Sequence, residues 1–387
     1  MLTVNKINHN IFFKGRIIDA HTHVGYWDKP DGKPYELKDI FEITNKTKID
    51  GDTVEKVIVS SLYCLKTDSN GKPLAGELEG NKAMLESIKN NKFAAPLAVC
   101  QPGIGSVKNI EELFEKNPNS FVGLKIHPKN LKLRADDEAY KAYLEFAEKN
   151  NLPCLFHSQC AIDYDKSVLK TAIEDMDPSD PRFIYSLAKK TSKVPVILGH
   201  MGAGGKPAHE KALEVLLESI NTGDANLYAD ISWVGIQSDK NIIDTEMIIK
   251  AIKELKNTSK GDKTDRLLFG TDAPIAEFSE VDGLYTRFVR EIKSAIKKNF
   301  GDEEGEKLID KIFYQNSADL FKLDAQEVAE KSIKKGNKIL KYFGVGSLVL
   351  LGLAGFTSQL VKKQSGKTVV TTQDTKPAEL KYNPFKN

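Results

Sequence analysis

The sequence predicts an α/β fold, a (β/α)8 TIM barrel, followed by a hydrophobic helix and a polar tail. Two observations carry this prediction. Short apolar runs typical of buried strands alternate with amphipathic runs of helical period over roughly 250 residues, the usual size of such a barrel. Five of the apolar runs also end directly in histidine, lysine or aspartate, and the ends of parallel barrel strands converge on one mouth.

Most strand candidates are short apolar runs, so both faces of the sheet are expected to be covered. We expect the strands at residues 16–20, 54–60, 93–100, 121–126, 153–156, 194–198, 227–231 and 266–269. An open doubly wound sheet fits less well, because its first strand usually leads into a glycine-rich phosphate loop. The sequence HTHVGYW stands at that position instead.

Between the strands, apolar residues recur at the spacing of one helix face. We expect helices at residues 81–89, 110–116, 136–149, 182–190, 209–220, 242–255, 284–298 and 305–321. Two long loops, 24–37 and 159–180, follow strand ends on the side of the expected mouth. Loops in that position shape the substrate pocket of a barrel enzyme.

The amino-acid composition limits the kinds of protein that this chain can be. Hydrophobic residues make up 40% of the 387 residues, enough to bury a large core. Lys and Arg number 56 against 54 Asp and Glu, and this balance argues against a nucleic-acid partner. The four cysteines lack CxxC spacing, which favours a reducing cytosol.

The two ends of the chain differ from the barrel. Residues 1–15 are a lead-in without the features of a signal peptide, and the barrel is expected over 16–325. A basic linker helix over 326–341 then precedes a hydrophobic segment at 342–361. Residues 362–387 form a polar tail that is expected to be disordered.

The segment 342–361 is a candidate transmembrane helix. It carries no charged residue, and about 20 apolar residues suffice to span a bilayer core. Lysines flank it and are more numerous on its N-terminal side, so the positive-inside rule keeps the barrel cytoplasmic, anchored at the membrane. The alternative is a hydrophobic helix packed on the barrel or on a partner subunit.

The first strand ends in His21 and His23. Residues two apart on a strand point to the same face, so both imidazoles can bind one metal ion. Taken alone, this spacing is a weak signal, because two histidines beside a loop are common. The polar residues at the other strand ends strengthen it.

His157 ends the fifth strand and Asp272 the eighth, and they are the natural third nitrogen ligand and carboxylate ligand. Three histidines and one aspartate leave a coordination position for a water whose pKa the metal lowers toward neutrality. Asp272 can then take the proton from that water and pass it to the leaving group. Read singly, His157 is a core histidine and Asp272 a helix cap.

Other polar residues at strand ends have roles that the sequence leaves open. His200 is a ligand to a second metal or a neutral donor that orients the water or polarises the scissile carbonyl. Lys125 is a carbamylated bridge between two metals, an ammonium that binds a substrate carboxylate, or a side chain that reaches the rim. His127 is expected to contact substrate. Asp19 either accepts a hydrogen bond from a ligand histidine or is simply a charge at the end of the strand. Asp230 and Ser232 read as pocket lining only.

The motifs DAHTH, GLKIHP, LFHS, LGHMG and FGTDAP, in this order, resemble those of the amidohydrolase superfamily. The resemblance is closest to the amidohydrolase-related (family 2) branch of metal-dependent TIM-barrel hydrolases, and it covers roughly residues 17–323, with YQNSADLFKL similar to the closing helix. It implies one Zn²⁺ or similar divalent ion, or two, held by His21, His23, His157 and Asp272. It also implies that His200 lies beside the reacting centre and that Asp272 is the proton shuttle.

This branch contains hydrolases, lactonases and non-oxidative decarboxylases. Its decarboxylases often carry glutamate in place of the first histidine, whereas His21 is present here. The resemblance therefore favours hydrolysis of a C–N or C–O bond in an amide, lactone or ester. The alternatives are decarboxylation of a small carboxylic acid at the same site and a non-catalytic barrel tethered at the membrane. The expected partners are a small-molecule substrate, a membrane through 342–361 and a second copy of the chain.

Overall fold

The computed structural model describes residues 15–26, 32–45, 51–69, 71–163, 165–237, 242–275, 278, 281 and 283–323. The chain divides into two units, Met1–Ala329 and Glu330–Asn387, and all described residues belong to the first. The predicted linker helix, hydrophobic segment and tail at 326–341, 342–361 and 362–387 lie outside the described residues. Within the described ranges, no helix combines the length and apolar character needed to cross a membrane.

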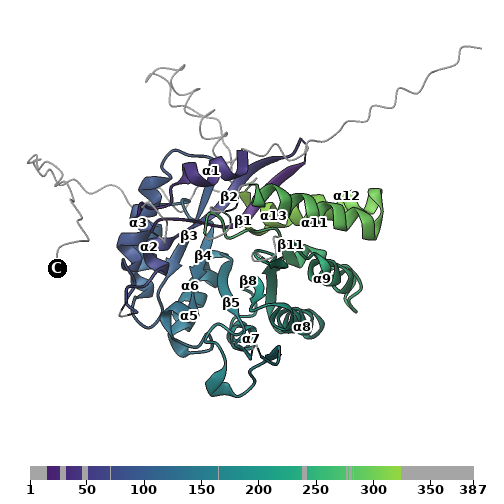
Figure 1. The fold of residues 1–387 in the computed structure, drawn as a ribbon. Coiled ribbons are helices and arrows are strands. Elements are labelled where there is room, and N and C mark those ends of the chain that lie inside the picture. The colour runs from purple at the N-terminus through teal and green to yellow at the C-terminus, as the bar shows by residue number, and fades with distance from the viewer. Residues whose placement is uncertain are drawn as a thin grey trace, which may run out of the picture. The chain divides into compact units, whose positions relative to one another are not determined.

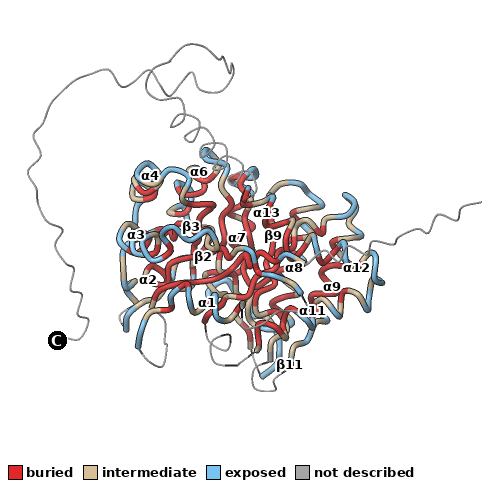
Figure 2. Tube along the Cα trace, turned by 90° about the horizontal axis from the view of Figure 1, so that it is seen from above, coloured by how far each residue is buried: buried red, intermediate tan, exposed pale blue. Residues whose placement is uncertain are grey.

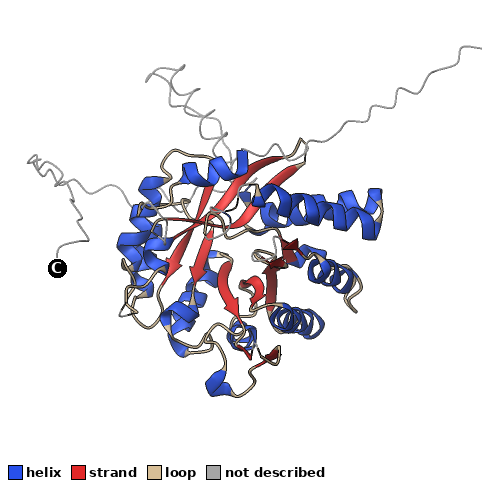
Figure 3. Ribbon diagram, in the orientation of Figure 1, coloured by secondary structure: helices blue, strands red, loops and turns tan. Residues whose placement is uncertain are grey.

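Eight parallel strands form one sheet in the order β1-β2-β3-β4-β5-β8-β9-β12, surrounded by helices (Figures 1 and 3). This arrangement confirms the predicted TIM barrel, and each predicted strand region contains one strand. The strands are β1 Arg16–Val24, β2 Thr53–Ser61, β3 Ala94–Cys100, β4 Gly123–Ile126, β5 Cys154–Gln159, β8 Pro195–Ala203, β9 Asn226–Asp230 and β12 Leu267–Leu268.

Backbone hydrogen bonds between the last and the first strand regions close the ring. The N–H of Ala20 donates to the carbonyl of Phe269 at 2.9 Å, and the N–H of His23 donates to Ala273 at 2.8 Å. Between them, the N–H of Asp272 donates to the carbonyl of His21 at 2.7 Å. The chain segments around residues 20 and 272 therefore lie side by side along this seam.

The helices lie mainly between successive strands and cover the outside of the barrel. They are α1 Leu37–Asn45, α2 Leu62–Leu65, α3 Glu77–Ser87, α4 Val107–Lys116, α5 Pro128–Leu131, α6 Lys141–Asn150, α7 Pro181–Lys190, α8 Lys206–Thr222, α9 Glu246–Lys256, α11 Leu284–Phe300, α12 Asp302–Asp310 and α13 Asn316–Leu320. Short 3-10 turns are η1 Glu138–Tyr140, η2 Ile173–Asp175 and η4 Thr264–Arg266, and η5 Lys311–Gln315 is a π-helix.

Two of the helix predictions differ from the structure. The helix expected over 242–255 begins only at Glu246, because β11 Ile242–Ile243 pairs antiparallel with β10 Ile236–Gln237. The helix expected over 305–321 is divided into α12, the π-turn η5 and α13, because the chain adds an extra residue per turn at 311–315. A second small hairpin, β6 Ile162–Asp163 with β7 Val168–Leu169, lies in the long loop predicted over 159–180.

Buried residues follow the strands and the inner parts of the helices, and exposed ones lie toward the outside (Figure 2). Two apolar layers hold the barrel together. The larger layer lies between the strands and the surrounding helices. The smaller one lies inside the barrel and is formed mainly by Ile18, Ala20, Ile58, Ala95, Leu97, Leu155, Ile197 and Leu268, with Tyr314, Ala318 and Phe321 beside them. Because apolar side chains fill this end of the barrel, polar side chains gather at the other end, where the strands finish.

Candidate metal centre

The seam between β12 and β1 brings together two histidines and one aspartate. Nε2 of His23 lies 2.8 Å from Oδ1 of Asp272, and Nε2 of His21 lies 3.2 Å from the same oxygen. The centroids of the two imidazole rings are 5.2 Å apart. The structure thus brings together these three predicted site residues, although Asp272 is 249 residues from His23 in the sequence.

A bulge in β1 helps both histidines to face the mouth. Ile18 and Ala20 belong to the inner apolar layer, so strict alternation would place Thr22 on the same side. The pairing of β1 with β2 is irregular between Asp19 and Thr22, and a bulge of this kind re-aims the side chains that follow it.

The donor set of His21, His23 and Asp272 fits a divalent metal ion. One ligand atom from each residue lies within 4.8 Å of the others. Burial lowers the pKa of both imidazoles, and at His21 the charge of Lys125 adds to this effect. Neutral imidazole nitrogens and an ionised carboxylate are the forms that bind metal. Two nitrogens and one oxygen suit Zn²⁺ and similar ions, with room for further ligands.

Each imidazole has a polar partner on the side away from Asp272. Nδ1 of His21 lies 3.0 Å from Oδ2 of Asp230, and Nδ1 of His23 lies 2.8 Å from Oγ of Ser60. A carboxylate can only accept a hydrogen bond, so Nδ1 of His21 carries the proton and Nε2 keeps its lone pair. Such partners hold a ligand histidine in the orientation and tautomer that metal binding requires.

Asp230, at the end of β9, was predicted only to line the pocket. In the structure it contacts several groups of the site. Besides His21, it accepts hydrogen bonds from the backbone N–H of His200 at 2.9 Å and from the hydroxyl of Ser232. Burial by itself would raise the pKa of Asp230, but His21 and these hydrogen bonds hold it below the usual range, so the carboxylate is ionised. The position of Asp230 at the end of a predicted strand is the sequence feature that could have indicated this role.

Three further histidines, His127, His157 and His200, form a row beside the first group. Nε2 of His200 lies 3.1 Å from Nδ1 of His157, whose ring stacks on His127 at 3.9 Å with 9° between the planes. Nε2 of His157 lies 3.4 Å from Oε1 of Gln159. Among the described residues, the clusters able to hold a metal include His200 but not His157. The role of His157 as third nitrogen ligand therefore stays a prediction.

Lys125 lies inside this site and not at its rim. It is 1% exposed, and its Nζ is 2.7 Å from Nε2 of His21. Burial lowers the pKa of the amine to about 8, although Asp272 and Asp230 oppose the change. The amine is therefore mostly protonated at pH 7 with a reactive neutral fraction, which keeps both the ammonium and the carbamylation hypotheses open.

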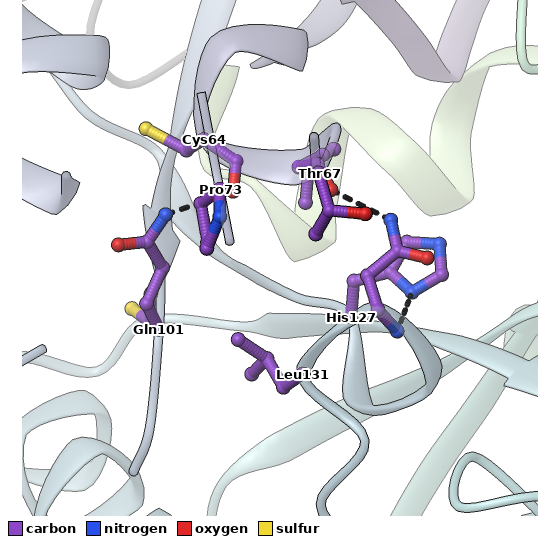
Figure 4. Close-up of a pocket in the computed structure, with 9 residues that line it drawn as sticks. Cys64, Thr67, Pro73, Gln101, His127 and Leu131 are labelled. Atoms are coloured by element: carbon purple, nitrogen blue, oxygen red, sulfur yellow. Dashed lines mark hydrogen bonds between the residues drawn. The ribbon is translucent and has the colours of Figure 1, made fainter. Parts of the chain in front are cut away.

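His127 forms part of the wall of a small pocket at the ends of β3 and β4 (Figure 4). Its Nδ1 accepts a hydrogen bond from the backbone N–H of Asn130 at 3.3 Å, so its proton is on Nε2. The amide of Asn130 donates to the carbonyl of Leu65 at 2.6 Å, which ties the loops after β2 and β4 together. Cys64, Thr67, Pro73, Cys100, Gln101 and Leu131 complete the lining.

Asp19 supports the seam and does not contact an imidazole ring. Its carboxylate accepts hydrogen bonds from the backbone N–H and the hydroxyl of Thr271, at 3.0 and 2.6 Å, and from the backbone N–H of His21 at 3.2 Å. Burial raises its pKa to about 7 despite these bonds. The expected hydrogen bond to a ligand imidazole is thus replaced by one to the backbone of His21.

Several residues of the site have strained backbones. His200, Trp233 and Asp272 adopt φ values of 61°, 62° and 73°, in the left-handed region that non-glycine residues rarely occupy. Each such residue costs on the order of 1–3 kcal/mol, and such residues cluster at functional sites. The strain here aims three side chains at the same small volume.

Two glycines leave the space that His21 needs. A Cβ at Gly199 would lie 3.3 Å from Cε1 of His21 and 2.7 Å from the carbonyl of Phe156. A Cβ at Gly270 would lie 3.0 Å from Cβ of His21. Any larger residue at these positions would therefore push the imidazole or the strand backbone away.

Replacing Asp230 with asparagine tests its hold on His21. We expect Asp230→Asn to weaken metal binding by about 10- to 100-fold, because the imidazole loses a charged partner that can only accept and faces an amide that can also donate. Equilibrium dialysis against Zn²⁺ with elemental mass spectrometry measures the affinity. Asp265→Asn, an exposed aspartate before β12, is the matched control and should bind like the unmodified protein. Equal affinity in the two variants would contradict the assigned role of Asp230.

Comparisons with known proteins agree with the fold. The sequence model of the amidohydrolase family matches residues 92–323, well over half of the chain. This region carries Lys125, His157, His200, Asp230 and Asp272, whereas the HxH motif precedes it. No curated protein matches the chain in sequence.

Solved structures with the same barrel include proteins of different activity. A probable 2-pyrone-4,6-dicarboxylic acid hydrolase from Acinetobacter baumannii is 16% identical, with 79% of this chain and 98% of that chain covered and a TM-score of 0.50. The 5-carboxyvanillate decarboxylase LigW from Sphingomonas paucimobilis is 14% identical, with 79% and 99% covered and a TM-score of 0.50. An uncharacterised TIM-barrel protein from Bordetella bronchiseptica is 15% identical, with 80% and 99% covered and a TM-score of 0.51.

Identities this low establish the shared fold and leave the reaction open. The family model adds the relationship in sequence, over a region that contains six of the barrel's eight strands in full, together with the residues that follow them. The barrel and the matched region together show that the chain belongs to the amidohydrolase family, a family of enzymes.

Proposed function

We propose that this enzyme is a metal-dependent hydrolase that cleaves a C–N or C–O bond of a small amide, lactone or ester. The observation that carries the proposal is the convergence of neutral Nε2 atoms of His21 and His23 on Oδ1 of Asp272 at the mouth of the barrel. A bound divalent ion would supply Lewis acidity and lower the pKa of water. Zn²⁺ is the ion that this donor set suits best.

The proposed ligands are His21, His23 and Asp272, with His157 as a further nitrogen donor. A ligand role for His157 requires that one ring nitrogen leave its present partner, because Nδ1 lies beside His200 and Nε2 lies beside Gln159. One ion is the simplest occupancy. A second ion would need an added bridging carboxylate, which carbamylation of Lys125 would provide.

Asp272 is the proposed proton carrier. Burial alone would raise its pKa, but the adjacent His21, His200 and His23 hold that pKa far below the usual range of an aspartate. The carboxylate is therefore ionised and able to accept a proton from the attacking water. It can then return this proton to the leaving nitrogen or oxygen.

His200 is the proposed neutral donor toward the reacting carbonyl. Burial lowers its pKa to about 4, so its imidazole is uncharged at neutral pH. Its ring centroid lies 4.8 Å from that of His21, which puts it next to the proposed ligands. Ser232 contacts its Nδ1 at 2.8 Å and holds the ring in place. Its Nε2 lies 3.1 Å from Nδ1 of His157 and would have to leave this partner to donate to the substrate.

Decarboxylation is the second candidate, and Lys125 is the observation that favours it. A buried ammonium beside the proposed ligands offers a counter-ion for the carboxylate of a substrate. The structural neighbours named as a probable dicarboxylic acid hydrolase and a carboxyvanillate decarboxylase both have names that refer to carboxylic acids. The shared substrate class under both candidates is thus a small carboxylic acid.

We also propose that residues 342–361 anchor the barrel, over 16–325, to the cytoplasmic face of a membrane. The support is the uncharged sequence of the segment and the lysines that flank it.

Replacing Asp272 with asparagine tests the proton carrier. We expect Asp272→Asn to keep the fold and to lower turnover by about 10²- to 10⁴-fold, because the amide cannot accept the proton. Turnover is measured on a panel of amides, lactones and esters, and circular dichroism checks the fold. Asp265→Asn serves again as the control that should keep full turnover. A folded Asp272→Asn protein with unchanged turnover would refute the proposed mechanism.

Replacing Lys125 with methionine distinguishes the two reactions and the two roles of the lysine. For a carboxylate substrate we expect Lys125→Met to raise KM by about tenfold or more with a smaller change in kcat, because a binding charge is lost. Products are assayed as CO₂ and as hydrolysis product on the same substrates. Hydrolysis without CO₂ would remove the decarboxylase, and CO₂ release alone would remove the hydrolase. A fall in bound zinc from two equivalents to one in Lys125→Met would instead assign the bridging role.

Flotation with lipid vesicles tests the anchor. We expect the full-length chain to float with vesicles and a chain ending at residue 341 to remain at the bottom of the gradient, because only the former carries the apolar segment. Recovery of the full-length chain in solution without detergent would contradict the proposal.

A further inference from the structure

The two carboxylate oxygens of Asp272 have different surroundings. Oδ1 lies 2.8 Å from Nε2 of His23 and 3.2 Å from Nε2 of His21. Oδ2 accepts a hydrogen bond from the indole Nε1 of Trp233 at 3.0 Å. The carboxylate is therefore held with one oxygen toward the two imidazoles and the other toward a neutral donor.

The position of Trp233 is costly to the backbone. With φ at 62°, it occupies a region that a bulky side chain normally avoids, and Asp272, its partner, is also in this region at 73°. Two strained residues joined by one hydrogen bond indicate that the surrounding structure enforces this contact.

The indole N–H is chemically suited to fixing the Asp272 carboxylate. Its N–H only donates, and it neither takes up nor releases a proton near neutral pH. It can therefore fix Oδ2 without competing for the metal or for the proton. Phe278 packs edge-on against the indole, with ring centroids 5.5 Å apart and 78° between the planes, and so supports the ring from another side.

Trp233 completes a set of contacts that start from one short segment. Asp230 contacts His21, Ser232 contacts His200, and Trp233 contacts Asp272. Three residues at the end of β9 and just after it thus hold three separate side chains of the centre. Trp233 is the member of this set that acts on the carboxylate.

We propose that Trp233 is a positioning residue that holds Asp272 as a donor through Oδ1 alone. The proposal rests on the proposed metal-dependent function and adds to it. It extends the metal centre to a residue that no sequence motif assigned. Loss of the indole N–H lets the carboxylate turn, so the donor set loses its geometry while the barrel stays folded.

Fluorescence gives a direct test, because the chain contains two tryptophans, Trp27 and Trp233. Trp27→Phe leaves Trp233 as the single indole, and Co²⁺, which quenches nearby fluorophores, is the probe. We expect saturable quenching of Trp233 at one equivalent of Co²⁺ in this background. Binding of Co²⁺ without quenching would place the ion away from Trp233 and overturn the proposal.

Two further variants in the same background separate the hydrogen bond from packing. We expect Trp233→Phe to weaken Co²⁺ binding by about 10- to 100-fold, the usual effect of losing such a partner, and to lower kcat more than it raises KM. Phe278→Leu removes only the supporting ring and should bind Co²⁺ within a fewfold of the background. Equilibrium dialysis with elemental mass spectrometry measures all three proteins, and thermal melts confirm that they are folded.

The outcomes distinguish this inference from the function on which it rests. If the unmodified protein binds no Co²⁺ or Zn²⁺, the metal-dependent function itself fails. If it binds metal and Trp233→Phe binds with equal affinity, the role of Trp233 fails while the function stands. Should Trp233→Phe not fold, the quenching measured with Trp233 in place still decides the inference.

Discussion

The hydrogen bonds of the seam between β12 and β1 are the constraint on which the centre depends. The N–H of Asp272 donates to the carbonyl of His21, and the neighbouring bonds from Ala20 and His23 fix the register on either side. A shift by one residue would turn the side chains of one strand to the opposite face. The alignment of three backbone bonds thus decides whether two imidazoles and a carboxylate meet, before any side-chain interaction contributes.

The charges of the buried groups explain why the site suits a cation. Burial keeps the imidazoles neutral, while Asp230 and Asp272 remain ionised and Lys125 is mostly protonated. These groups leave the centre with a net charge near −1 at neutral pH. A divalent ion would reverse this sign, and a substrate carboxylate could then approach it.

The sequence was enough to predict the barrel and several polar residues that meet at its mouth, because both follow from local patterns. Apolar runs located all eight strands, and the polar residues at their ends included His21, His23, Lys125 and Asp272. The partners could not be predicted, because they depend on packing between strands. Asp230 was predicted only as pocket lining, since no sequence pattern indicates which side chain a residue at the end of a strand will face. The antiparallel pairing at Ile242–Ile243 was not predicted either, because it too depends on contacts between strands.

The seam also has a consequence for how the protein matures. Two of the three donors come from the first strand and the third follows the last, so a chain still being synthesised carries an incomplete centre until residue 272 has left the ribosome. An ion that binds only the closed barrel stabilises the finished protein over every partly folded form. Metal capture would thus mark the end of folding, and an incomplete chain would remain without the ion and open to proteolysis.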